Sequence, residues 1–127
     1  MRAFGKTYPL ERLFHALADR TRLRLLHLMA EREVCVCHFV EVLQAPQPKI
    51  SRHLAHLRRA GLVTARRDGK WIHYRLARPA DAHAAQVLQS TLEALHLDRS
   101  MQRDQTHLQK ACCELDGLLR LAGTAKS

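Results

Sequence analysis

Residues 47–76 constrain the fold of this chain more than any other segment, because they join a short amphipathic helix to a tight hairpin. Pro48 stands at the start of the helix, where its missing N–H costs no hydrogen bond and its fixed φ suits the first turn. Asp68-Gly69 is a strong hairpin signal between two segments that carry apolar and β-branched residues. A helix followed by such a hairpin predicts a winged helix-turn-helix.

The other helices are predicted from apolar residues at helical spacing and from capping residues. Residues 8–17 carry leucines and a phenylalanine on one face, and Asp19 is a suitable N-cap for a second helix over residues 20–31. Residues 36–43 show the same periodicity before Pro46 interrupts it. The helix over residues 36–43 and the helix that begins at Pro48 therefore form the predicted helix-turn-helix.

These elements predict one domain that is mainly α with a small β-hairpin, in the order α-α-α-α-β-β-α. A chain of 127 residues with 46% apolar residues supplies one modest core, so residues 1–127 are expected to form a single winged helix-turn-helix domain. The helix-turn-helix covers about residues 36–60 and the wing residues 62–76. Arg78-Pro79 ends the second strand, and helical periodicity continues over residues 80–121.

Positive charge dominates the composition, with 21 Lys and Arg against 12 Asp and Glu and a formal net charge of +9. Such a chain favours a polyanionic partner, because each neutralised phosphate releases condensed counterions. No apolar run approaches the roughly 20 residues that span a bilayer, and the N-terminus lacks a signal-peptide stretch. We expect a cytoplasmic protein that binds duplex DNA and no membrane. The sequence contains no HExxH, phosphate-binding glycine loop or nucleophile elbow, so no enzymatic activity is expected.

The helix that follows Pro46 can be oriented by its own periodicity. At about 100° per residue, Ile50, Leu54 and Leu57 fall on one side and are expected to face the core. The opposite side is polar and cationic, which suits the major groove of DNA. His53 lies on the core side and is interpreted as a packed or hydrogen-bonded histidine. The predicted DNA contacts of this helix are Gln47, Lys49, Ser51, Arg52 and His56.

The hairpin signal also predicts a strand register. A type I′ turn at Asp68-Gly69 would place Arg67 opposite Lys70 and Arg66 opposite Trp71. Arg66 over the Trp71 ring would then form a cation–π pair. Arg67 and Lys70 would project at the tip and touch the minor groove or flanking phosphates. The same register gathers an apolar face of Val63, Ala65, Ile72 and Tyr74.

Three motifs in this order and spacing resemble the ArsR/SmtB family of metal-sensing repressors, and its arsenic-responsive branch in particular. They read EVCVC over residues 33–37, QPKISRHL over residues 47–54 and DGKWIHYRL over residues 68–76, and the resemblance covers about residues 10–95. It implies a homodimer joined by its first and last helices, operator binding without inducer, and release when a thiophilic ion binds. One recognition helix per chain, set one DNA turn apart in such a dimer, predicts an inverted-repeat operator.

The cysteines depart from the arsenic-responsive pattern, in which CVC is followed after two residues by a third cysteine. Val40 stands at that position here. The resemblance implies that As(III) and Sb(III) prefer three thiolates, and thiolates select soft metals. Cys112 or Cys113, from the same chain or its dimer mate, could complete a set with Cys35 and Cys37. Alternatively, a methylated arsenical, a trivalent organoarsenical with one site blocked by carbon, would need two thiols, and another soft ion or no inducer also remain open.

The spacing of Cys35 and Cys37 suggests a coupling mechanism. On an α-helix, residues two apart point about 200° from each other, so both thiolates could reach one ion only if the helix start were distorted. That distortion would misplace the recognition helix and release DNA. The helix N-terminus is also expected to favour thiolate over thiol and make both cysteines reactive.

Two other classes of function compete with metalloid sensing. Closely spaced thiols in a reducing compartment also suit a thiol-redox or persulfide-responsive regulator without a metal inducer. A DNA-packaging protein without any inducer is the third class. Cys112 also has a purely structural interpretation, because it lies on the apolar face of its helix and cysteine is often a small buried hydrophobe.

Overall fold

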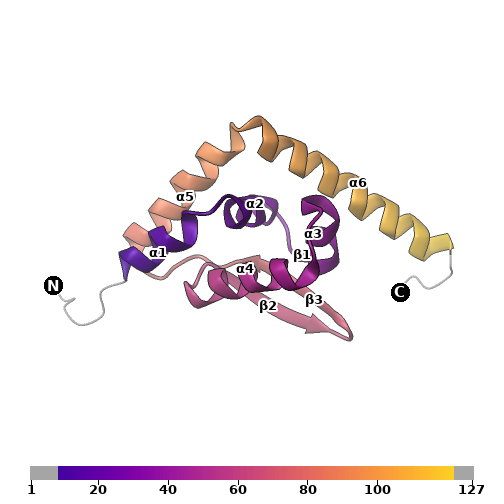
Figure 1. The fold of residues 1–127 in the computed structure, drawn as a ribbon, viewed down its shortest axis with the longest axis horizontal. Coiled ribbons are helices and arrows are strands. Elements are labelled where there is room, and N and C mark those ends of the chain that lie inside the picture. The colour runs from indigo at the N-terminus through magenta and orange to yellow at the C-terminus, as the bar shows by residue number, and fades with distance from the viewer. Residues whose placement is uncertain (1–8, 122–127) are drawn as a thin grey trace.

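The computed structural model describes the backbone of residues 9–121 and the side chains of residues 9–112. The described chain contains six helices and three short strands (Figure 1). Their order confirms a mainly helical fold with a winged helix-turn-helix. The elements are α1 (Leu10–Leu17), α2 (Arg20–Leu28), β1 (Val34–Cys35), α3 (Val36–Leu43), α4 (Gln47–Arg59), β2 (Val63–Asp68), β3 (Trp71–Leu76), α5 (Ala82–His96) and α6 (Arg99–Leu121).

The local signals placed the helix starts well. The Asp19 carboxylate accepts a hydrogen bond from the Arg22 backbone N–H and caps α2, and α3 has the predicted bounds. The helix α2 ends at Leu28, three residues before the predicted end, because the chain turns there toward β1. Asp98 interrupts the C-terminal helical region, since its carboxylate accepts from the backbone N–H groups of Ser100 and Met101 and starts α6.

The strand β1 was not predicted. It is two residues long and pairs antiparallel with β3, which makes a three-stranded sheet in the order β1-β3-β2. A strand this short has no periodicity of its own, so only the pairing with β3 defines it. The element order α-α-α-α-β-β-α therefore gains this strand before α3 and a second helix at the C-terminal end.

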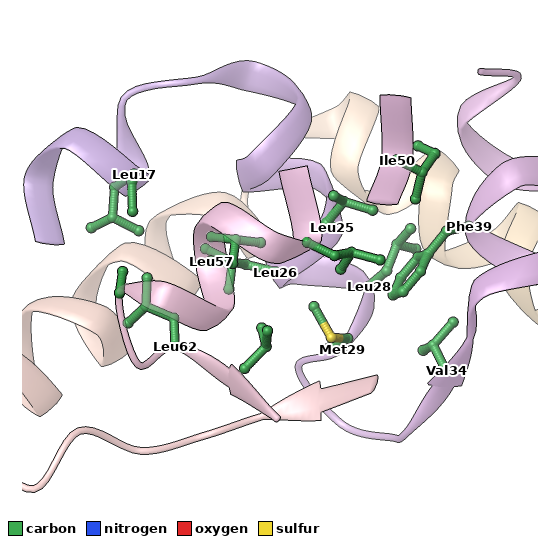
Figure 2. Close-up of a cluster of buried hydrophobic side chains, with 14 of the residues drawn as sticks. Leu17, Leu25, Leu26, Leu28, Met29, Val34, Phe39, Ile50, Leu57 and Leu62 are labelled. Atoms are coloured by element: carbon green, nitrogen blue, oxygen red, sulfur yellow. The ribbon is translucent and has the colours of Figure 1, made fainter. Parts of the chain in front are cut away.

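The core lies around α2, whose Leu25, Leu26 and Leu28 are completely buried (Figure 2). The helices α5 and α6 form an arch over α2 in Figure 1, while α4 and the wing lie on the opposite side. Two ion pairs, Arg24 with Asp104 at 2.8 Å and Arg20 with Asp98 at 3.4 Å, link α2 to the start of α6. This arrangement leaves α4 and the wing together on one side of the molecule.

The observed register of the wing differs from the prediction by two residues. Asp68 pairs with Trp71, and Arg66 pairs with His73. The turn is therefore Gly69-Lys70, with φ of +63° at Gly69 alone of the two, which is the pattern of a type II′ rather than a type I′ turn. A shift of two residues keeps each side chain on its face of the sheet, so the predicted apolar face is retained although its partners change.

No helix within the described residues combines the length and the apolar character that crossing a membrane requires.

Candidate DNA-binding surface and dithiol site

The helix α4 has the orientation that its periodicity predicts. Ile50, Leu54 and Leu57 are completely buried against the core. Pro46 is the N-cap residue and Pro48 lies in the first turn, so the helix begins at Gln47. Of the predicted contact residues, Gln47, Lys49 and Arg52 are exposed, while Ser51 and His56 are half-buried.

The two histidines of α4 that face its neighbours are held by other side chains. The His53 Nδ1 atom lies 3.3 Å from the Arg22 guanidinium and 3.9 Å from the Asp19 carboxylate, as expected for a hydrogen-bonded rather than base-reading histidine. The His56 ring stacks on His15 of α1, with ring centroids 5.1 Å apart and ring nitrogens at 3.3 Å. Burial, and then the neighbouring Arg22 and His15, lower the pKa of His56.

The wing carries its cations at and beside the turn. The Arg67 Nε atom donates to the Gly69 carbonyl at 3.0 Å, and Lys70 Nζ lies 5.7 Å from the centroid of the Trp71 ring. The predicted cation–π pair between Arg66 and Trp71 is wrong, because the register places Arg66 opposite His73 instead. Lys70 occupies that position over the ring. Both predicted wing contacts, Arg67 and Lys70, are exposed.

Arg66 has a different partner that the sequence analysis missed. Its guanidinium donates two hydrogen bonds to the Glu33 carboxylate, from Nε at 2.8 Å and from a terminal nitrogen at 2.7 Å. Glu33 lies two residues before Cys35, so this paired interaction links the segment before the cysteines to the wing strand β2. The only signal in the sequence was an acidic residue beside the CVC motif, and nothing local identified its partner.

The Sγ atoms of Cys35 and Cys37 lie 3.1 Å apart, although the prediction placed them on opposite sides of a helix. The difference arises because Cys35 precedes the helix. It is the N-cap residue of α3, with an extended backbone at φ −75° and ψ 144°, and it belongs to β1. The two thiols therefore already share one location, and the predicted distortion of the helix start is not required to bring them together.

The electrostatics of this pair also differ from the prediction. Burial, the hydrogen bond to Cys35 and the charge interaction with Cys35 raise the pKa of Cys37 to about 12. The backbone N–H groups of Cys37 and His38 act in the opposite direction, as the helix-terminus argument expects, but their effect is smaller. Cys37 therefore holds its proton and donates it toward Cys35, so the expected thiolate character at the helix N-terminus is wrong for Cys37.

Of the distal cysteines, Cys112 is half-buried on α6, and its Sγ atom lies 3.7 Å from Nδ1 of His38 on α3. This places Cys112 of the same chain beside the residue that follows Cys37. Cys113 lies outside the residues whose side chains are described. Among side chains up to Cys112, no three metal-ligating groups meet at one point, so Cys112 does not complete a three-thiol set with Cys35 and Cys37 in this conformation.

The sequence of this chain is similar to several curated regulators. It is 51% identical over 77 residues to the arsenical resistance operon repressor of Escherichia coli, a match that covers 60% of this chain and 66% of the relative. Two arsenic resistance transcriptional regulators of Pseudomonas putida match similarly. ArsR1 is 54% identical over 50% of this chain and 51% of its own length, and ArsR2 is 45% identical over 65% and 72%. The chain thus spans between 51% and 72% of the length of these relatives.

The fold is similar to solved winged-helix regulators. HlyU from Vibrio cholerae matches with a TM-score of 0.56 at 28% identity, covering 64% of this chain and 85% of that protein. The transcriptional repressor BigR from Xylella fastidiosa matches with a TM-score of 0.53 at 33% identity, covering 64% and 80%. Residues 19–65 match the family model described as bacterial regulatory protein, arsR family. Because ArsR2 is 45% identical and is matched over 72% of its length, the chain belongs to this ArsR family of helix-turn-helix proteins, whose members are DNA-binding transcriptional regulators rather than enzymes.

Proposed function

We propose that this chain is a transcriptional repressor that binds an inverted-repeat operator as a homodimer and dissociates when trivalent arsenic or antimony binds at Cys35 and Cys37. The observation that carries the proposal is the 3.1 Å contact between the two Sγ atoms at the first residues of the helix-turn-helix. The arsenical resistance operon repressor and the arsenic resistance transcriptional regulator among the relatives support the same kind of inducer.

The proposed DNA interface combines α4 with the wing. Both lie on the side opposite the α5–α6 arch (Figure 1), and their exposed cations include Lys49, Arg52, Arg67 and Lys70. The net charge of +9 adds a long-range attraction for phosphates. In this arrangement the N-terminal half of α4 reads base edges in the major groove, and the wing holds the flanking backbone.

The proposed dimer uses the first and last helices, as in the family that the sequence resembles. Two apolar side chains of α1 are exposed in the single chain, Leu10 at 43% and Phe14 at 52%. Exposed apolar surface of this kind on one helix is consistent with a partner that covers it. A two-fold dimer would place two α4 helices side by side for adjacent half-sites.

The proposed inducer reaction balances when it is written for the thiol form of both cysteines. When arsenous acid, As(OH)₃, meets the pair, each sulfur forms an As–S bond as an As–O bond breaks. Each thiol proton leaves with the departing hydroxide as water, and the oxidation state of arsenic does not change. The soft sulfur donors select arsenic and antimony over the hard cations that oxygen ligands bind.

The third coordination position of arsenic distinguishes arsenite from a methylated arsenical as the inducer. Cys112 of the same chain lies beside His38 and is the nearest described candidate for a third thiolate. A methylated arsenical has carbon at that position and needs only Cys35 and Cys37. If Cys112 or Cys113 supplies the third thiolate, its replacement by serine weakens the response to arsenite and leaves the response to methylarsenite unchanged.

Operator anisotropy of the reduced full-length protein, with DNA from its own promoter, tests this function. We expect arsenite and antimonite to release the wild type. Cys35→Ser and Cys37→Ser should bind the operator with wild-type affinity and stay bound when arsenite is added. Release of either serine variant at the wild-type arsenite concentration would exclude the dithiol as the inducer site.

The close sulfur contact also favours a second candidate, a thiol-redox regulator. Oxidation would join Cys35 and Cys37 as a disulfide, with two electrons and two protons passing to an oxidant such as a peroxide or a polysulfide. The same anisotropy assay separates the candidates. Release by oxidant but not by arsenite supports the redox regulator, and binding without sequence preference or release supports DNA packaging.

A further inference from the structure

The strand β1 joins the dithiol directly to the wing. Cys35 supplies one sulfur of the pair, and its backbone pairs with His73 of β3. Val34 pairs with Tyr74 and is 1% exposed, so the residue before Cys35 is fixed in the core. Any movement of the Cys35 backbone is therefore also a movement against β3.

A second contact reinforces this connection. Glu33, just before β1, accepts two hydrogen bonds from Arg66 of β2 at 2.7 and 2.8 Å. Residues 33–35 thus contact both wing strands. By contrast, Cys37 belongs to the first turn of α3, so the two sulfurs that one inducer would bridge come from two different structural units, the sheet and the helix.

The pairing of β1 with β3 is short and breaks more easily than the pairing of β2 with β3. It consists of two residue pairs, whereas β2 and β3 share six. Covalent As–S bonds fix the separation and direction of the two sulfurs, while the α3 turn is held by its own helical hydrogen bonds. The strain of bridging falls first on the shorter pairing. A ligand shifts an equilibrium only through such a difference between two states.

We propose that β1 transmits inducer binding to the wing. Two As–S bonds would replace the direct S–H···S contact, so the Cys35 side chain would have to turn to the bond direction that arsenic sets. This turn takes the Cys35 backbone out of its pairing with His73, which loosens β3 and withdraws Arg67 and Lys70 from the DNA backbone. This inference rests on the proposed function. It replaces the route through α3 and α4, because Cys35 lies outside the helix in a strand of only two residue pairs, which takes up the change in sulfur geometry more easily than the α3 turn does.

The chain contains its own reporter of this event. Trp71 is the single tryptophan, stands at the first residue of β3 and is 46% exposed under the Lys70 side chain. In DNA-free, reduced full-length protein, we expect arsenite to change the Trp71 emission and to accelerate amide exchange severalfold in β3, with α3 unchanged. Cys35→Ser should show neither effect. Bound arsenic with unaltered Trp71 emission and β3 exchange would overturn the inference.

Two matched double variants test whether arsenite releases the operator through the wing or through α4. The double variant Arg67→Ala/Lys70→Ala removes the proposed wing contacts, and Lys49→Ala/Arg52→Ala removes two cations from α4. For each, the operator dissociation constant is measured with and without arsenite, and the ratio of the two values is the fold-release. If arsenite acts by withdrawing the wing, the wing variant loses arsenite-free affinity and its fold-release falls toward one. The α4 variant loses affinity but keeps the wild-type ratio.

If the wing variant keeps the wild-type fold-release and that of the α4 variant falls toward one, the wing route is contradicted. A wing variant with both wild-type affinity and wild-type fold-release would contradict it as well. The amount of arsenic retained per protomer after desalting is measured by elemental mass spectrometry. This measurement separates failure of the wing route from failure of the proposed function. Retained arsenic with the reversed pattern rejects only the β1 route. No retained arsenic in the wild type rejects the inducer site itself and the β1 route with it.

Discussion

At the scale of single residues, His27 shows how burial of one imidazole couples stability to pH. Its side chain is 2% exposed, its ring lies 5.8 Å from that of His96, and its Nδ1 atom has no hydrogen-bond partner among the described residues. Burial first, and then His96, lower the pKa of His27 below its ordinary value near 6.5, although Asp104, Glu31 and Asp98 act in the opposite direction.

A lowered histidine pKa has a definite sign for stability. Above pH 7 the folded and unfolded chains both hold neutral His27, but below 6.5 the unfolded chain takes up a proton that the folded chain does not. Stability should therefore fall as the pH decreases, by up to about 1.4 kcal/mol per pH unit for one proton. The free energy of unfolding in urea should decrease less between pH 7.5 and pH 5.5 for His27→Leu than for the wild type. The exposed His83→Gln variant is the control, and an equal loss in His27→Leu would contradict the assignment.

At the scale of elements, the wing turn determines where its cations project. Gly69 adopts φ of +63°, and a Cβ atom placed there would meet no atom within 4 Å. The requirement for glycine is therefore conformational rather than steric. A β-hairpin with glycine at the first turn position matches the right-handed twist of its strands, which keeps Lys70 in the turn and Arg67 in the strand beside it.

Gly69→Ala should destabilise the protein by about 1–2 kcal/mol, because an L-residue with a Cβ resists positive φ. The melting temperature should fall by several degrees, and operator affinity should fall with it because the wing is displaced. Gly69→Asn should recover much of both losses, since asparagine adopts this conformation more readily than alanine. Calorimetry and operator anisotropy measure the two effects, and an alanine variant as stable as the wild type would show that the turn tolerates a different geometry.

At the scale of the whole molecule, the described chain is an arch of α5 and α6 over a core around α2, with the proposed DNA interface on the far side (Figure 1). Exposed Leu10 and Phe14 on α1 mark the proposed dimer contact. In the proposed dimer each protomer would supply one α4 helix and one wing to the operator, so dimerisation would raise the operator affinity.

Phe14→Glu should shift the protein from dimer to monomer, because a carboxylate would have to be buried in an apolar contact. Light scattering after size exclusion should give half the wild-type mass, and operator affinity should fall by at least about tenfold, which is 1.4 kcal/mol. Trp71→Glu is the matched control, since Trp71 is also an exposed aromatic residue but lies on the wing. It should remain dimeric, and a dimeric Phe14→Glu variant would exclude the α1 contact.

The sequence by itself determined the features that depend on neighbouring residues. The apolar spacing of Ile50, Leu54 and Leu57 oriented α4, and Asp19 capped α2, because helix periodicity and capping act within one or two turns. The sequence motifs also identified the family correctly. The fold class followed from these local signals and from the glycine turn.

Tertiary structure alone decided the features that depend on segments far apart in the chain. The strand β1 exists only through β3, the ion pair of Glu33 and Arg66 spans 33 positions, and the turn register was settled by strand pairing rather than by the Asp68-Gly69 signal. The sulfur contact between Cys35 and Cys37 arises because that pairing holds Cys35 extended outside the helix. Helical spacing could not reveal this contact, since the backbone conformation of Cys35 is set by a strand nearly 40 residues away.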